Sequence, residues 1–143
     1  MSRIIAIDYG LKRVGVAVSD PTQTIAGGLA TVAPAEVFKF FENYFANNSV
    51  EKFVIGLPRQ TNGKDSEIVP QIRKFAAMLQ KRFPAREIVF FDERFTSILA
   101  HRTMLEAGLR QKARRNKALV DKISATIILQ EYLENRRQLI INN

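Results

Sequence analysis

The chain has 143 residues, no cysteine and a formal net charge of +8 at pH 7. This length is typical of one domain, and we expect residues 1–143 to form a single domain. The absence of cysteine excludes disulfides, thiolate zinc sites and cysteine nucleophiles, while the lack of a long apolar run or a signal-peptide pattern favours a cytoplasmic protein without a membrane helix. The excess of positive charge favours a polyanionic partner, most commonly nucleic acid.

The first half of the chain predicts three strands followed by a helix. Residues 3–8 are a β-branched apolar run ended by Gly10, and residues 13–19 repeat that pattern. So few residues separate the two runs that a parallel crossover is excluded, which predicts an antiparallel hairpin. A third strand over 25–32 would continue the meander. After Pro34, apolar residues at helical spacing predict a helix that packs in the core: Val37, Phe38, Phe40, Phe41, Tyr44 and Phe45.

The second half alternates strands and helices. We expect a strand over 52–57, a helix over 68–79, a strand over 86–91, a helix over 97–107 and a long helix over 119–137. Pro70 is compatible with a helix only near its first turn, because a proline further in removes a backbone hydrogen bond. Residues 139–143 could be a short strand or a frayed end. The order predicts an α/β fold whose mixed five-stranded sheet joins a three-strand antiparallel meander to two parallel strands, flanked by helices.

Three acidic residues occupy positions that suggest chemistry. Asp8 ends an apolar strand, where an unpaired charge is costly to bury, although an aspartate there can simply begin a turn. Glu93 follows the strand over 86–91, at the sheet edge where α/β proteins usually bind ligands, but it could equally pair with Arg94 or cap a helix. Asp121 lies on the inward stripe of the last helix, although an acid in a first turn also complements the helix dipole.

Carboxylates drawn from two strands and a helix are hard oxygen ligands, which suit Mg²⁺ or Mn²⁺ better than zinc. Two such ions can clamp the attacking and leaving oxygens of a phosphodiester and lower the pKa of the attacking water. We therefore expect Asp8, Glu93 and Asp121 to be catalytic residues that bind one or two metal ions. Asp20 and Asp92 are further acids that could join them.

The positive charge is concentrated in one segment. Residues 1–50 carry four basic and four acidic side chains. The segment 110–117, in contrast, contains Arg110, Lys112, Arg114, Arg115 and Lys117. We expect this segment to contact nucleic-acid phosphates, although a run of charge can also be a solvated surface. Such contacts supply affinity without sequence specificity.

Four blocks of the chain together resemble the YqgF/RuvX family. They are Asp8-Tyr9-Gly10-Leu11-Lys12-Arg13-Val14-Gly15-Val16-Ala17 with Ser19-Asp20, then Gly56-Leu57-Pro58 with Gly63, then Asp92-Glu93-Arg94 with Thr96-Ser97, then Asp121 before a small-residue pair. Their order and spacing are similar to the family's, over essentially the whole chain. Arg59 after Gly-Leu-Pro and Ser124 in place of an alanine depart from the pattern.

The resemblance implies a ribonuclease H-like hydrolase, related to Holliday-junction resolvases, that cleaves phosphodiester bonds as an endonuclease. It further implies a role in ribosome biogenesis through rRNA processing, with 5′-end maturation of 16S pre-rRNA, alone or in ribosomal precursor particles, favoured over branched DNA. The family's acidic triad corresponds to Asp8, Glu93 and Asp121. Lys12 and Arg13 would contact phosphate beside the metal site, and Arg59 could add another contact.

Two alternatives remain open. A Holliday-junction resolvase acting on four-way DNA would need two active sites and therefore a dimer. A non-catalytic RNA-binding ribosome-assembly factor would bind RNA with a steep salt dependence and be indifferent to Asp8→Asn. A sugar-kinase-like phosphotransferase is disfavoured, because one small domain leaves no second lobe to close over ATP.

Overall fold

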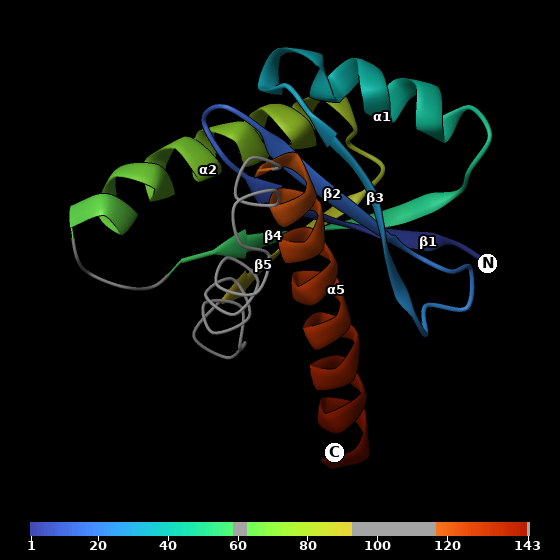
Figure 1. Cartoon of the computed structure of the whole chain (residues 1–143). Coiled ribbons are helices and arrows are strands. Elements are labelled where there is room, and N and C mark those ends of the chain that lie inside the picture. The colour runs from blue at the N-terminus through green and yellow to red at the C-terminus, as the bar shows by residue number, and fades with distance from the viewer. Residues whose placement is uncertain (59–62, 93–116, 143) are drawn as a thin grey trace.

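The strands form one five-stranded mixed sheet in the order β3-β2-β1-β4-β5 (Figure 1). The computed structural model describes the backbone of residues 1–58, 63–92 and 117–142. Side chains are described for residues 1–58, 67–92 and 118–136. The strands are β1 (Arg3–Tyr9), β2 (Val14–Ser19), β3 (Ala26–Val32), β4 (Val50–Leu57) and β5 (Glu87–Asp92). Pairing is antiparallel for β1 with β2 and β2 with β3, and parallel for β1 with β4 and β4 with β5. The predicted meander plus two parallel strands is confirmed.

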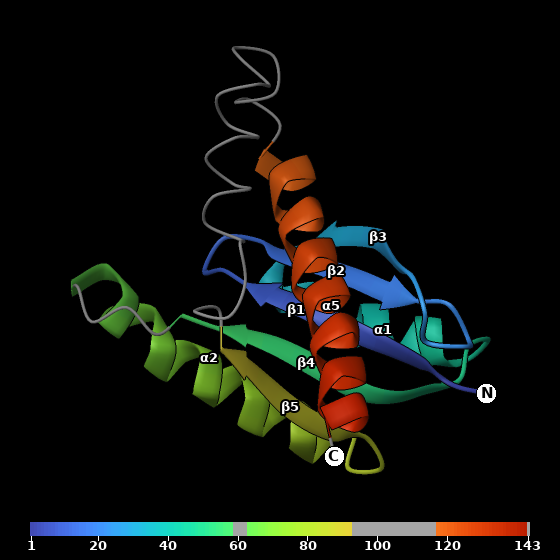
Figure 2. The ribbon, with the colours of Figure 1, turned by 90° about the horizontal axis from the view of Figure 1, so that it is seen from below.

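Helices cover both faces of this sheet. A 3₁₀ turn, η1 (Pro34–Glu36), leads into α1 (Val37–Phe45), which lies with α2 (Gly63–Arg82) on one face. The long α5 (Lys117–Asn142) crosses the other face (Figure 2). Among the described helices, none is both long and apolar enough to cross a membrane. The helix predicted over 97–107 lies outside the described residues.

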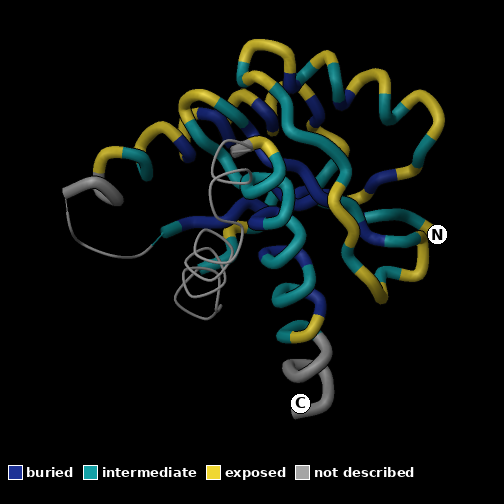
Figure 3. The backbone as a smooth tube through the Cα atoms, viewed as in Figure 1, coloured by how far each residue is buried: buried dark blue, intermediate teal, exposed yellow. Residues whose placement is uncertain are grey.

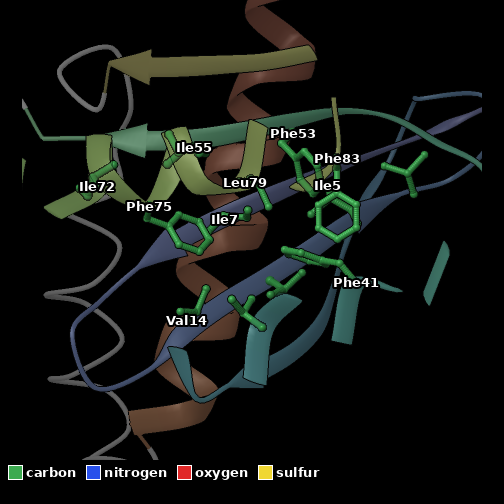
Figure 4. Close-up of a cluster of buried hydrophobic side chains, with 14 of the residues drawn as sticks. Ile5, Ile7, Val14, Phe41, Phe53, Ile55, Ile72, Phe75, Leu79 and Phe83 are labelled. Atoms are coloured by element: carbon green, nitrogen blue, oxygen red, sulfur yellow. The ribbon is translucent and has the colours of Figure 1, made fainter. Parts of the chain in front are cut away.

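The larger core lies between the sheet and helices α1 and α2. Strand alternation turns Ile5 and Ile7 of β1 toward these helices, where both side chains are fully buried (Figure 4). Phe41 of α1 packs against Phe53 of β4, with their ring centroids 5.1 Å apart. The aromatic residues predicted after Pro34 therefore pack in the core, as expected.

The smaller core lies under α5. Ile4 and Ala6, which alternate with Ile5 and Ile7 along β1, contact the buried face of this helix. Its buried residues are Ala125, Ile128, Leu129 and Leu133. The two cores lie on opposite faces of the central strands β2, β1 and β4, which carry the buried residues of the sheet (Figure 3). The position of α5 is therefore determined by the face of the sheet that carries the even-numbered residues of β1.

The ends of two helices differ from those expected from the sequence. Helix α2 begins at Gly63, so Pro70 lies inside the helix and not in its first turn. Pro70 is solvent-exposed, where water can satisfy the carbonyl that loses its partner. Helix α5 continues through Asn142, so the tail over 139–142 is helical and not a strand. The start of α2 over 63–67 is polar, and the tail over 139–141 is an uninterrupted apolar run, so neither segment has a helical periodicity from which the end could be read.

Candidate active site

The parallel strands β1, β4 and β5 bring their carboxyl ends to one edge of the sheet. Ile7 pairs with Ile55, and Leu57 pairs with Asp92, the last residue of β5. Asp8 follows Ile7 directly, so it lies at this edge. Ligands of open α/β sheets usually bind at the carboxyl ends of the strands. Asp8, a half-buried carboxylate, is therefore in a position where it can meet a ligand.

The register of β1 determines the face on which Asp8 lies. Ile4 and Ala6 both pack against α5, and alternation places Asp8 on that same face. The cross-strand partner of Asp8 on β2 is Gly15. Directly opposed residues of an antiparallel pair share a face of the sheet. Because Gly15 has no side chain, β2 places no side chain beside Asp8 on the face of the sheet that α5 covers.

Helix α5 comes very close to the sheet at Gly15. A Cβ atom on Gly15 would lie 2.2 Å from the carbonyl oxygen and 3.3 Å from the Cβ of Asp121. One turn earlier, the hydroxyl of Thr31 on β3 donates a hydrogen bond to the carbonyl of Ala118. Because Gly15 is also the partner of Asp8, the first turns of α5 bring Asp121 to the same part of the α5 face as Asp8.

The positively charged side chain of Arg13 forms an ion pair with Asp121. The Nε of Arg13 donates a hydrogen bond to Oδ2 of Asp121 at 2.7 Å, and the two side chains are 36% and 23% exposed. Arg13 directly precedes β2, and its neighbour Lys12 is exposed. Both predicted phosphate contacts therefore lie near the carboxylates, but Arg13 pairs with one of them.

The other acids of the motif lie elsewhere. Asp20 follows β2, whose end pairs with the beginning of β1, so it lies at the opposite edge of the sheet from Asp8. Its carboxylate accepts hydrogen bonds from the amide of Ile25, the hydroxyl of Thr22 and the amide of Thr24, which lower its pKa below the ordinary value. Asp92 is at the same edge as Asp8 but pairs with Leu57, whose side chain lies in the core under α1 and α2. Asp20 is thus at the other edge of the sheet from Asp8, and Asp92 is on the other face.

Several expected site residues lie outside the described part of the chain. Glu93 comes immediately after the last residue of β5. Arg59 and the basic segment Arg110, Lys112, Arg114 and Arg115 are likewise outside it, and Lys117 is described only as the first backbone position of α5. Within the described residues, no three His, Cys, Asp or Glu side chains cluster as a metal site would require. The described part therefore brings together Asp8 and Asp121, with Arg13 between the hairpin turn and α5.

Two features of the site were not predicted from the sequence: the contact at Gly15 and the ion pair of Arg13 with Asp121. A signal for the first exists in the sequence. Gly15 interrupts the β-branched run Val14-Gly15-Val16, and a glycine inside a strand often marks the close approach of another backbone. The ion pair joins residues far apart in the chain and has no local signal.

A mixed sheet in this strand order, with acids at the carboxyl edge and α5 across the face that carries Asp8, defines a ribonuclease H-like fold. A family model described as "RuvX: Holliday junction resolvase" matches residues 2–135, and the chain belongs to this family. The predicted family, the predicted fold and the predicted nuclease activity, hydrolysis of phosphodiester bonds, are thereby confirmed. Resolvase-like nucleases of this fold generally use divalent metal ions and act on nucleic acid.

Relatives and a solved structure agree with this assignment. A protein of Bacteroides thetaiotaomicron named "Putative pre-16S rRNA nuclease" is 59% identical over 137 residues, which cover 96% of this chain and 99% of the relative. A protein of Porphyromonas gingivalis with the same name is 53% identical over 135 residues, covering 94% and 98%. RuvC of T. thermophilus, solved in complex with a Holliday junction substrate, superposes with a TM-score of 0.55 at 15% identity, covering 96% of each chain. That likeness shows the shared fold.

Proposed function

We propose that this chain is a metal-dependent endonuclease whose metal ligands are Asp8, Asp121 and Glu93. The observation that carries the proposal is the contact of Asp121 with Gly15, the cross-strand partner of Asp8, because it gathers carboxylates of β1 and α5 on one face. Hard carboxylate oxygens without sulfur ligands suit one or two Mg²⁺ or Mn²⁺ ions. The donor set therefore fits the metals that nucleases of this fold use.

The residues of the site divide the work. When bound, the metal ions lower the pKa of a water molecule and neutralise charge on the phosphate. Asp8 and Asp121 hold and orient them from a strand and a helix whose separation is determined at Gly15. Lys12 and Arg13 supply positive charge for the substrate phosphate. Arg59 and the segment 110–117 bind other phosphates of the nucleic-acid strand. The products carry 5′-phosphate and 3′-hydroxyl ends, whereas cyclic phosphate ends would exclude this scheme.

The substrate that we propose is the 5′ region of 16S pre-rRNA, free or in ribosomal precursor particles in the cytoplasm. The name shared by relatives that match at 59% and 53% identity supports this choice. We also propose that residues 1–143 act as one domain, since both cores share the same sheet.

The test incubates the full chain with a precursor 16S RNA 5′ fragment and Mn²⁺ or Mg²⁺, with EDTA as a control. Asp8→Asn is compared with Asp20→Asn, the same substitution in an aspartate at the opposite edge of the sheet. We expect metal-dependent cleavage that Asp8→Asn abolishes and Asp20→Asn retains, with RNA binding preserved in both. Binding without cleavage, unchanged by metal, would instead support a non-catalytic assembly factor.

A second candidate is a Holliday-junction resolvase, favoured by the family's description and by the fold shared with RuvC. A resolvase must cut two strands symmetrically and therefore acts as a dimer. Cleavage of a four-way DNA junction at the same enzyme concentration, together with the molecular mass in solution, separates the two candidates. Faster cleavage of the junction than of the RNA, by a dimer, would favour the resolvase.

A further inference from the structure

We propose that Arg13 is a counter-ion that Asp121 exchanges for a divalent metal ion, and that the released guanidinium then binds a substrate phosphate. Metal binding and nucleic-acid binding would thus be coupled through one side chain. This inference rests on the proposed function and adds to it the way in which the site is regulated.

The ion pair has the geometry of a contact that can be exchanged. The Nε of Arg13 lies 2.7 Å from Oδ2 of Asp121, within the range of a charge-assisted hydrogen bond. Both side chains are partly exposed, at 36% and 23%, so water and ions reach the pair. A fully buried pair could not be separated without a large desolvation cost, but a half-exposed one can.

The backbone on both sides of the pair is held, so the side chain of Arg13 is the part that can move. Asp121 cannot approach the sheet more closely, because its carbonyl already lies against Gly15. The hairpin turn is also tight, since a Cβ on Gly10 would lie 2.8 Å from the carbonyl oxygen of Arg13. A long, flexible arginine side chain can nevertheless reach a new partner without any change in the fold.

Exchange makes the two binding events cooperative. While Arg13 holds Asp121, a metal ion must compete with a guanidinium for that carboxylate. A phosphate that attracts Arg13 removes this competitor and so tightens metal binding. By linkage, the metal must tighten nucleic-acid binding by the same factor. If Arg13 only held α5 to the hairpin turn, its removal would weaken metal binding and leave the coupling unchanged.

The test measures Mn²⁺ binding, by the electron paramagnetic resonance signal of free Mn²⁺, with and without a ten-nucleotide 2′-O-methyl RNA, and gel electrophoresis verifies that the RNA stays intact during the titration. A titration of the oligonucleotide alone corrects for Mn²⁺ that it binds. The wild-type chain is compared with Arg13→Gln, with Arg13→Lys as the conservative variant. Lys122→Gln is the matched control, because it removes the same charge from the residue that follows Asp121, whose side chain lies against Gly28 of β3. Thermal unfolding followed by circular dichroism verifies that each variant is folded.

For the wild-type chain, we expect the oligonucleotide to tighten Mn²⁺ binding by about fivefold or more, the lower end of typical coupling between sites. Arg13→Gln should bind Mn²⁺ more tightly than wild type without the oligonucleotide, and the oligonucleotide should tighten its Mn²⁺ binding clearly less than in wild type. Arg13→Lys should retain more of the coupling than Arg13→Gln, and Lys122→Gln should retain it fully.

Three results would overturn the exchange while leaving the nuclease proposal intact. They are full coupling in Arg13→Gln, weaker Mn²⁺ binding by Arg13→Gln alone, and an equal gain in Mn²⁺ affinity for Lys122→Gln, which would indicate a general charge effect. A folded wild-type chain that binds no Mn²⁺ under any condition would instead overturn the proposed function itself, and the exchange with it.

Discussion

Gly15 of β2 lies so close to Asp121 of α5 that no side chain fits at position 15. A Cβ atom on the glycine would be 2.2 Å from the aspartate's carbonyl oxygen. The same glycine is the cross-strand partner of Asp8. One position without a side chain therefore determines how near the helix comes to the sheet, and with it the separation of two proposed metal ligands.

Replacing Gly15 by alanine should therefore damage both stability and metal binding. The added methyl group meets backbone, which cannot rotate away, so we expect a loss of about 1–3 kcal/mol in the free energy of unfolding, measured by urea denaturation. Gly27→Ala is the matched control, because the nearest atom to a Cβ there is 4.0 Å away. Equal effects of the two substitutions would contradict the close contact.

The aromatic residues of α1 should matter for stability and not for chemistry. Phe41 is fully buried against Phe53, so Phe41→Ala should lower the free energy of unfolding by about 3–5 kcal/mol. Phe90 is 37% exposed, and Phe90→Ala should cost clearly less. The measurement is chemical denaturation of both variants, with cleavage activity normalised to the folded fraction. A loss of activity by folded Phe41→Ala would indicate a role in the site.

Much of the fold could be predicted because it depends on local patterns. The alternation of β1 and the helical spacing after Pro34 identify buried faces without any knowledge of tertiary structure. The beginning of α2 could not be predicted, since Pro70 suggests a boundary that the rest of the helix overrides. For the site, Asp8 could be placed by its strand, but the pair of Arg13 with Asp121 depends on how α5 crosses the sheet, which no local pattern encodes.

Asp20 should make stability depend on pH in a defined direction. Hydrogen bonds from Ile25, Thr22 and Thr24 lower the pKa of its carboxyl below the ordinary 3.8, so they stabilise the folded state when the group is ionised. This contribution is fully present above that value and is lost as the pH falls through the lowered pKa. We expect wild type to exceed Asp20→Asn in stability at pH 7, by a margin that shrinks at pH values below 3.8. A margin independent of pH, in urea denaturation, would contradict this assignment.

The basic segment should account for much of the salt dependence of RNA binding. Each phosphate contact to a single strand contributes a slope of about 0.7 in a plot of log affinity against log salt. Replacing Arg110, Lys112, Arg114, Arg115 and Lys117 by glutamine should therefore make the slope shallower by up to about 3.5, measured by fluorescence anisotropy. A control with Lys39, Lys74 and Lys81 replaced removes exposed charge from α1 and α2, on the face opposite Asp8, and should change the slope little. Equal changes in both variants would show that the segment has no special role.

The central claim is that Asp8 and Asp121 share a divalent metal ion. The most direct test is an anomalous difference map from crystals of the full chain soaked in Mn²⁺. We predict a peak roughly 2 Å from a carboxylate oxygen of each residue, the distance expected for small divalent ions bound by oxygen. Mn²⁺ bound only elsewhere, or no peak under conditions in which the protein cleaves nucleic acid, would contradict the claim.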